Sequence, residues 1–449
     1  MNQLQRYIEA FASLPAQVTQ AQAELESRET LTLSRTDGRS SGGRYACLNE
    51  LFVQATTDGK TGMLYTQKID EEPMNNILAA AENARFSAQT SPWLQNDAAA
   101  SCRFAPTGVP ATREQMEQQL ARIDQALAAS DPHLLSRQVE LSRYATRLAI
   151  ANSDGLQSES EHLFYELSVS MAADHNGTTE VEFEVSAQEL AKLSPQEIAR
   201  TAQQKFAEHL PLTQWQSGSC RCVLDASVVC NIFITAWQLF SGKLVGEHNS
   251  CLWNRLDQTV FSPQLNIVDR IESPYSGYHA ALDCEGSRAV ELELVRDGKV
   301  CGWMHNLSTA AQLGATSTGN AGRKPMISGA VQTDVVVVPK NLMVLPGQQT
   351  TDELIAQMGD GLFVNQSFDV FHSINLASGN FSIPCEAIVV RQGRPVGRVE
   401  GMTLEGNLLE LFGSVTAVGS EMFTFAMPII KSFAVSAPAL AVSSVKVSV

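Results

Sequence analysis

Apolar side chains recur at helical spacing in several parts of the first 210 residues. The clearest stripe follows a capping box formed by Thr112 and Gln115 and runs at steps of four, three and four residues: Met116, Leu120, Ile123 and Leu127. Shorter stripes over residues 4–11 and 74–81, and a second capping box at residues 194–197, predict three more helices. This part of the chain therefore carries several amphipathic helices.

Between these helices the pattern changes to alternation. Residues 31–33, 45–55 and 138–177 have β-like composition and are separated by turn clusters such as Asp37-Gly38 and Asp58-Gly59. At residues 180–185 glutamates alternate with Val181, Phe183 and Val185. We interpret these carboxylates as the solvated face of a half-buried strand, because nothing near them in sequence would shift their pKa values toward acid–base chemistry.

The second half of the chain is β-rich. Residues 289–295, 335–338 and 387–391 are strand-like, and residues 411–449 contain so few charges that they predict strands buried on a large face. One helix is expected after Thr350, which forms a capping box with Glu353. The stretch 210–218 is the best boundary. We predict an α+β protein, with an α/β domain at residues 1–210 that combines an antiparallel sheet with helices, followed by a β-rich domain at residues 211–449.

Composition limits the function classes. The chain has 449 residues, of which 44% are hydrophobic and 18% charged, and its net charge of −16 argues against a surface for nucleic-acid phosphates. The longest charge-free apolar stretch, residues 226–242, falls short of the ~20 residues that span a bilayer, so it predicts a buried helix and no membrane anchor. The first 15 residues lack the apolar core of a secretory signal, and nine scattered cysteines suit a reducing compartment. We expect a cytoplasmic protein.

Metal and phosphate motifs are incomplete. No two histidines have the spacing of a zinc-peptidase helix, in which two imidazoles reach one ion. His248 and Cys251 are three residues apart and would share a face of a helix, and Cys220 and Cys222 would lie on one side of a strand, but neither pair has a third ligand nearby in sequence. The glycine-rich segment 314–319 starts like a phosphate loop but continues without its lysine, so we reject nucleotide binding there.

Two loops remain as candidate contact sites. The acidic segment 283–286 is interpreted as a solvated tight turn in which Gly286 supplies a positive φ. Residues 317–323 combine two glycines with small polar residues, which would let another backbone approach, so either a plain structural loop or a contact with a peptide or subunit is possible. The candidate contact residues are Ser317, Thr318, Gly319, Asn320, Gly322, Asp283 and Glu285.

Eight short segments, taken in order, resemble the TldD/PmbA proteins, which are often labelled modulators of DNA gyrase. They are residues 151–156 (ANSDGL), 282–286 (LDCEG), 295–299 (VRDGK), 313–322 (LGATSTGNAG), 345–347 (LPG), 358–361 (MGDG), 378–381 (SGNF) and 403–408 (TLEGNL). The resemblance covers most of the chain and is strongest from about Ser217 onward. One departure is Arg323, which stands where the family usually has glycine.

The resemblance implies a role in a two-part peptidase. Its zinc-bearing TldD type carries His-Glu-x-x-x-His on a helix that aligns with residues 235–240, which here read TAWQLF, and a late cysteine ligand that is missing after Cys385. The chain is therefore most similar to the metal-free PmbA or TldE type. This implies no catalytic residue, metal or cofactor of its own, a heterodimer with a TldD-like zinc subunit, and an extended peptide as substrate.

Two other readings stay open. The chain would serve equally as a homodimer that binds peptides or proteins without catalysis. A third possibility is an independent peptidase that has rebuilt a site from His248, Cys251, Asp283 and Glu285.

Overall fold

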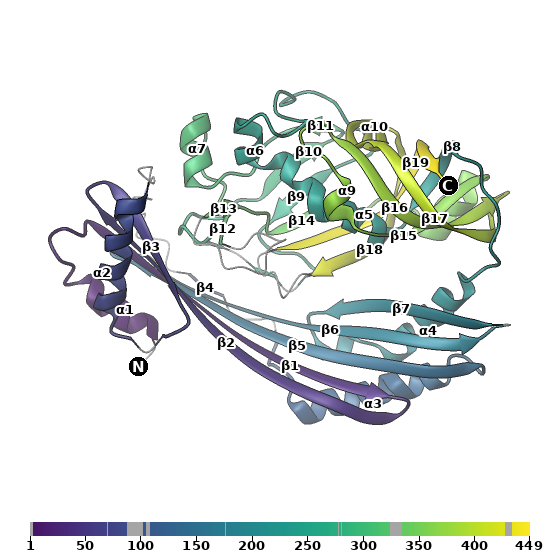
Figure 1. Cartoon of the computed structure of the whole chain (residues 1–449), viewed down its shortest axis with the longest axis horizontal. Coiled ribbons are helices and arrows are strands. Elements are labelled where there is room, and N and C mark those ends of the chain that lie inside the picture. Colours follow the sequence, from purple (N-terminus) through teal and green to yellow (C-terminus); the bar gives the residue numbers. More distant parts are fainter. Residues whose placement is uncertain are drawn as a thin grey trace.

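The computed structural model describes residues 3–69, 71–87, 102–104, 108–175, 177–276, 278–279, 281–323, 335–426 and 433–449. Two large sheets dominate it, one in each half of the chain (Figure 1). Helices accompany both sheets, and the expected α+β class is confirmed.

The first sheet is built from long hairpins. Its order is β3-β2-β1-β5-β6-β4, with β7 paired to β6, and every pairing except that of β4 with β6 is antiparallel. The strands are β1 (Gln20–Thr36), β2 (Arg39–Thr57), β3 (Lys60–Thr66), β4 (Cys102–Phe104), β5 (Leu134–Asn152), β6 (Gln157–Asp174) and β7 (Thr178–Ala187). The predicted turns are confirmed, since Asp37, Gly38, Asp58 and Gly59 all have positive φ, as two-residue hairpin loops require.

Four helices cover one face of this sheet: α1 (Gln3–Phe11), α2 (Pro73–Asn83), α3 (Arg113–Ala128) and α4 (Pro195–Ala207). The helices α1 and α2 bury one end of this face, and α3 and α4 bury the other. The capping box at the start of α3 is confirmed, because Gln115 N–H donates to Thr112 Oγ1 at 3.2 Å and Thr112 N–H donates to Gln115 Oε1 at 2.8 Å. All the apolar residues of its predicted stripe are buried.

The opposite face of the sheet curves toward the second half of the chain (Figure 1). It is polar because side chains alternate along each strand. The predicted alternation in β7 is confirmed, with Glu180, Glu182 and Glu184 exposed. Burial raises the pKa of the neighbouring Glu166 to about 7, and Glu184 and Glu140 add to the effect.

The second sheet contains a closed ring. Strand β19 pairs with both β17 and β8, so that β8, β15, β16, β17 and β19 close on themselves, while β14, β9, β10 and β11 extend from β19 and β18 pairs with it. The strands are β8 (Gly218–Leu224), β9 (Ile267–Arg270), β10 (Leu292–Arg296), β11 (Lys299–Val300), β14 (Asn341–Val344), β15 (Gly361–Ser367), β16 (Asn380–Arg391), β17 (Arg394–Asn407), β18 (Val415–Ala426) and β19 (Ala434–Ser448). A separate small ladder joins β12 (Ala321–Gly322) and β13 (Val336–Val337).

Short helices accompany this sheet: α5 (Ala226–Ala236), α6 (Gly242–Gly246), α7 (Leu307–Leu313), α8 (Thr351–Met358), α9 (Val370–Ser373) and α10 (Leu408–Gly413). The prediction of one helix over residues 226–242 is wrong in detail, because α5 passes into a 3₁₀ turn over Trp237–Phe240 before α6 starts. The capping box before α8 is confirmed. No helix among the described residues has the length and apolar character needed to cross a membrane.

Candidate functional site

A cavity of about 130 Å³ lies where the polar face of the first sheet meets loops of the second half. Strands β1, β5 and β6 contribute one wall, and loops around residues 275–284, 319–323 and 338–340 contribute the other. The polar side chains of the lining include Glu24, Glu26, Arg28, His162, Tyr278, Asp283, Asn320, Arg323 and Lys340. Apolar surface adjoins them from Phe52, Leu148, Phe164, Leu282, Val338 and Phe433. The cavity therefore combines charged groups with a hydrophobic lining, as small-ligand and peptide sites do.

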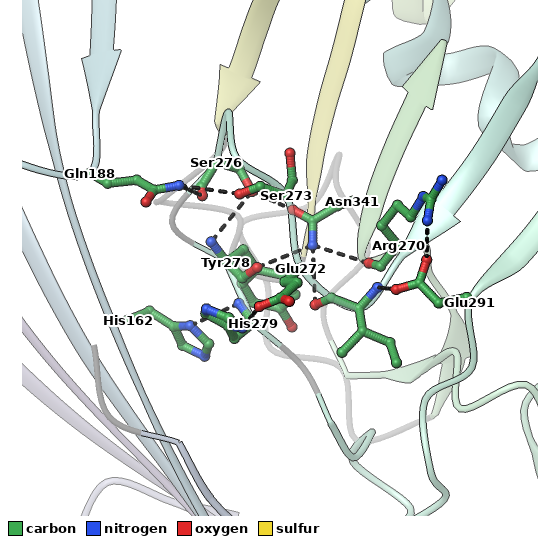
Figure 2. Close-up of polar contacts among 11 residues, drawn as sticks. His162, Gln188, Arg270, Glu272, Ser273, Ser276, Tyr278, His279, Glu291 and Asn341 are labelled. Atoms are coloured by element: carbon green, nitrogen blue, oxygen red, sulfur yellow. Dashed lines mark hydrogen bonds and ion pairs between the residues drawn. The ribbon is translucent and has the colours of Figure 1, made fainter. Parts of the chain in front are cut away.

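One wall is a loop over residues 271–279 that is tied to both halves of the chain (Figure 2). The Asn341 side-chain amide lies within hydrogen-bond distance of three carbonyl oxygens, those of Arg270 at 3.1 Å, Ile271 at 3.3 Å and Tyr278 at 3.1 Å. From the other side, Gln188, which follows β7, donates to the carbonyls of Ser273 at 3.2 Å and Ser276 at 2.9 Å. These bonds fix the loop against both sheets.

The same loop places an aromatic pair on the cavity. The rings of His162 and Tyr278 stack with centroids 4.8 Å apart, and the backbone N–H of His279 donates to His162 Nδ1 at 3.2 Å (Figure 2). Burial raises the pKa of Tyr278, and the carboxylates of Glu26 and Asp269 add to this effect, so the phenol stays protonated. Its hydroxyl group is therefore available as a hydrogen-bond donor.

Asp283 is buried, so the prediction of a solvated turn at residues 283–286 is wrong. Its Oδ1 accepts from the backbone N–H groups of Glu285 at 3.0 Å and Ser287 at 2.9 Å, and its Oδ2 accepts from Ala321 N–H at 3.0 Å. Burial raises the pKa of Asp283 to about 6, against the effect of these bonds. The positive φ of Gly286 is confirmed. The carboxylate thus joins the acidic turn to the glycine-rich loop.

Glu285 has a similar role toward a neighbouring helix. Its Oε2 accepts from the backbone N–H of Leu307, the first residue of α7, at 2.8 Å. Burial, together with a smaller effect of the nearby Asp283, raises the pKa of Glu285 to about 8. A carboxyl group at this position stabilises a helix N-terminus, but it is too buried to ionise easily.

The glycine-rich loop 317–323 is anchored by hydrogen bonds to neighbouring segments of the second half. The buried Asn320 side chain donates to Asp269 Oδ2 at 2.7 Å and to the Val338 carbonyl at 2.9 Å. Gly319 has a φ of +68°, and a Cβ there would lie 2.4 Å from the carbonyl oxygen of Arg288. Both the conformation and the space therefore require glycine at this position.

The structure brings together only some of the predicted contact residues. Asp283, Gly319, Asn320 and Gly322 line the cavity, whereas Ser317, Thr318 and Glu285 are not part of its lining. Ser317 and Thr318 instead lie at the His305 carbonyl, with their hydroxyl oxygens 3.4 and 3.1 Å from it. Their role as contacts for a peptide or subunit stays a prediction.

Two buried cations on the cavity, Arg323 and Lys340, are not among the predicted contact residues, although the sequence marks Arg323 as a departure from the family pattern. Arg323 Nε donates to Glu24 Oε2 at 2.5 Å, with side-chain exposures of 3% and 8%, and its guanidinium lies 5.1 Å from the centre of the Phe52 ring. Lys340 is 3% exposed, and its backbone N–H donates to Asp269 Oδ1 at 2.8 Å. Burial lowers the pKa of Lys340, whereas Asp269 and Asp283 raise it. Only the exceptional burial of these charges marks them, and a sequence pattern does not report burial between distant segments.

The candidate metal ligands do not assemble. His248 and Cys251 follow α6, which ends at Gly246, so the prediction that they share a helical face is wrong; the exposed His248 instead stacks on Trp253. Cys220 and Cys222 do lie on one side of β8, with their sulfur atoms 3.7 Å apart. Across the described part of the chain, no three His, Cys, Asp or Glu side chains gather closely enough to hold a metal ion.

Residues 235–240 form the end of α5 and the turn after it. All are buried except Gln238, which is partly buried. Among the described residues, the hydroxyl of Thr235 and the indole N–H of Trp237 have no hydrogen-bond partner. Trp237 packs edge-on against Phe433 of the cavity wall, with ring centres 5.7 Å apart. This segment therefore borders the cavity wall with aromatic and aliphatic groups.

Residues 217–449 match a family model described as the PmbA/TldA metallopeptidase C-terminal domain, and residues 110–210 match the central domain of the same family. A protein named Metalloprotease PmbA from Escherichia coli O157:H7 is 21% identical, over 88% of each chain. Other matches are partial: the chain spans about half the length of two relatives, covering 48% of a metalloprotease from Methanothermobacter thermautotrophicus and 58% of a PmbA homolog from Buchnera aphidicola.

Solved structures share the fold. TldE from Thermococcus kodakarensis has a TM-score of 0.81 at 16% identity, covering 100% of both chains. A proposed modulator of a DNA gyrase from Thermotoga maritima has a TM-score of 0.83 at 20% identity, covering 99% of both chains. At such identities the likeness establishes the architecture alone.

Proposed function

Since this chain belongs to the TldD/PmbA metallopeptidase family, we propose that it is the metal-free PmbA or TldE type of subunit in a cytoplasmic two-subunit peptidase that processes or degrades peptides. Its partner in this proposal is a TldD-like subunit that carries the zinc ion and cuts the peptide. The chain itself contributes no catalytic residue. It helps to enclose and hold the substrate.

The observation that carries the proposal is the chemistry of residues 235–240. A zinc site on this helix would need imidazole nitrogens and a carboxylate within reach of one ion. The residues present are Thr235, Ala236, Trp237, Gln238, Leu239 and Phe240. Alcohol, amide, indole and hydrocarbon groups do not supply the ligands of a zinc peptidase. Residues 235–240 therefore do not fit a zinc ion.

The cavity supports the substrate-holding part of the proposal. It lies between the two halves of the chain and offers apolar surface beside hydrogen-bonding groups, which suits a peptide side chain and its backbone. The glycine-rich loop would meet such a peptide as a surface and not as a strand edge, because its own N–H groups are used internally. Gly319 N–H donates to Ser317 Oγ at 3.2 Å, and Ala321 N–H donates to Asp283.

The residues of the alternative peptidase do not favour that reading. Asp283 and Glu285 accept hydrogen bonds from backbone N–H groups, and His248 lies on the surface beside Trp253. None of them is arranged with the others to activate a water molecule. We therefore do not propose an independent active site.

Co-purification with a zinc-motif relative from the same genome, followed by a cleavage assay, tests the proposed function. Each protein alone and an equimolar mixture would be incubated with an unfolded peptide, and products followed by mass spectrometry. We expect cleavage by the mixture, its loss after removal of zinc with a chelator, and no turnover by this chain alone.

Three results would contradict the proposal. Turnover by the isolated chain that survives further purification would show an active site of its own. Stoichiometric zinc in the isolated chain would show a metal site. A homodimer by light scattering that neither binds the relative nor changes its activity would favour the homodimeric binding protein instead.

A further inference from the structure

Three side chains on the cavity wall carry hydrogen-bond donors that the protein leaves unused. Arg28 of β1 has a side chain only 10% exposed and donates from one terminal nitrogen to Glu26 at 2.6 Å, and its buried Nε has no partner among the described residues. Lys340 has three N–H donors, yet its ammonium group makes one long bond of 3.5 Å, to the Thr318 carbonyl. The Tyr278 hydroxyl forms no hydrogen bond with any described residue.

The acidic groups around the cavity are already engaged. Glu24 is paired with Arg323, and Asp283 accepts three backbone N–H bonds. Asp269 accepts from the Asn320 amide and from the backbone of Lys340. Glu26 is the partner that Arg28 already has. The carboxylates of the wall therefore already have partners, and its formal charges are nearly balanced.

A ligand that supplied oxygen acceptors would satisfy this wall. An amine would add donors to donors, whereas a carboxylate has two oxygens with lone pairs on each and pairs well with guanidinium, ammonium and phenol groups. The volume of the cavity also limits which ligands fit. A cavity of about 130 Å³ is several times the roughly 10–15 Å³ that one water molecule requires, so it admits a short piece of a peptide but not a folded segment.

We propose that this cavity binds the carboxylate of a peptide, with Arg28, Tyr278 and Lys340 as its donors and the apolar lining around Phe52 and Phe164 holding the adjoining side chain. The proposal rests on the peptide-holding function proposed above and names the feature of the peptide that this chain recognises. Because Arg28 comes from the first sheet and Lys340 from the second half, the bound carboxylate would also bridge the two halves.

Fluorescence anisotropy on the full chain tests this directly. The probes are three apolar pentapeptides labelled at the amino end: one with a free C-terminal carboxylate, one with a carboxamide, and one carboxamide with an internal glutamate. We expect the free acid to bind at least tenfold more tightly than the plain carboxamide. Equal tightening by the internal glutamate would identify an acidic side chain as a second source of the same group.

Single substitutions test whether the carboxylate binds in this cavity. Tyr278→Phe keeps the ring that stacks on His162 and removes only the hydroxyl, so it serves as the variant that leaves packing intact. We expect Tyr278→Phe to weaken the free acid several-fold and Lys340→Met to weaken it more, with no change for the carboxamide. Tyr45→Phe and Lys243→Met, at exposed positions on β2 and α6, are the matched controls and should change nothing.

Equal affinity of acid and carboxamide, no binding of either, or an unchanged preference in both cavity variants would each overturn the inference. The cleavage assay on the subunit mixture is independent of these results. A mixture that cleaves without any carboxylate preference would leave the proposed function standing and remove only this inference. A carboxylate preference in a chain that neither binds nor aids a zinc subunit would instead remove the proposed function.

Discussion

The buried ion pair between Arg323 and Glu24 should be the most sensitive link between the two halves of the chain. The pair joins the glycine-rich loop to β1, 299 residues away in sequence, and both side chains are more than nine-tenths buried. Arg323→Met keeps most of the aliphatic volume but removes the guanidinium that pairs with the Glu24 carboxylate. Removing one partner of a buried pair typically costs about 3–5 kcal/mol, because the remaining charge is neither solvated nor compensated.

Screening by water reduces this estimate only slightly, because the two side chains are 3% and 8% exposed. A loss of about 3–5 kcal/mol is a large part of the ~5–15 kcal/mol that stabilises a typical domain. We therefore expect a clear fall in the urea midpoint of the first unfolding transition, followed by tryptophan fluorescence and circular dichroism. The exposed pair Arg113–Glu117 on α3 is the matched control, and Arg113→Met should leave the midpoint unchanged within error.

A double variant distinguishes the effect of losing the ion pair from the effect of losing side-chain packing. Glu24→Gln combined with Arg323→Met removes both charges, so it should recover at least half of the stability lost in Arg323→Met. A loss below about 1 kcal/mol in the single variant would show that water or another group solvates Glu24. A double variant no more stable than Arg323→Met would show that packing against Phe52, and not the charge, is responsible.

Two further predictions concern the loops behind the cavity. The pKa of Glu285 is raised to about 8 in the folded state, against 4.5 for the ordinary carboxyl group, so the folded state holds this proton more tightly than the unfolded state. The stabilisation that protonated Glu285 provides is therefore full below pH 4.5 and is lost as the pH rises toward 8. Glu285→Gln should flatten urea-midpoint profiles between pH 5 and about 8.5, and an unchanged slope would contradict the assigned burial. Gly319→Ala should lower the melting temperature by several degrees, because the added Cβ would lie 2.4 Å from a carbonyl oxygen. Gly42→Ala is the control, because the space around a Cβ at that position is open. Equal effects of the two substitutions would refute the close contact at Gly319.

Local patterns in the sequence specified many elements of the fold. The capping box at Thr112 and the stripe after it predict α3, and the alternation at residues 180–185 predicts β7, because each depends on neighbours within a few residues. The same locality explains the family resemblance, which rests on short turns such as residues 283–286.

The environment of those same turns was not predictable in this way. Asp283 has the sequence of a solvated turn, yet Gln22 of β1 covers the next residue by donating to the Cys284 carbonyl at 2.8 Å, 262 residues away. Burial by a distant strand leaves no periodic signal near the buried residue. The sequence of the turn specifies its own backbone conformation, whereas the residues that exclude water from it belong to the strand.

The amino-acid sequence alone determined several helices, the hairpin turns at residues 37–38 and 58–59, and the missing zinc ligands at residues 235–240, since each depends on local backbone geometry or side-chain chemistry. Tertiary structure alone decided that β8 and β19 close a ring and that Arg28, Tyr278 and Lys340 share one cavity. These residues come from segments far apart in the chain, and only the packing of one sheet against the loops of the other brings their donors to the same space.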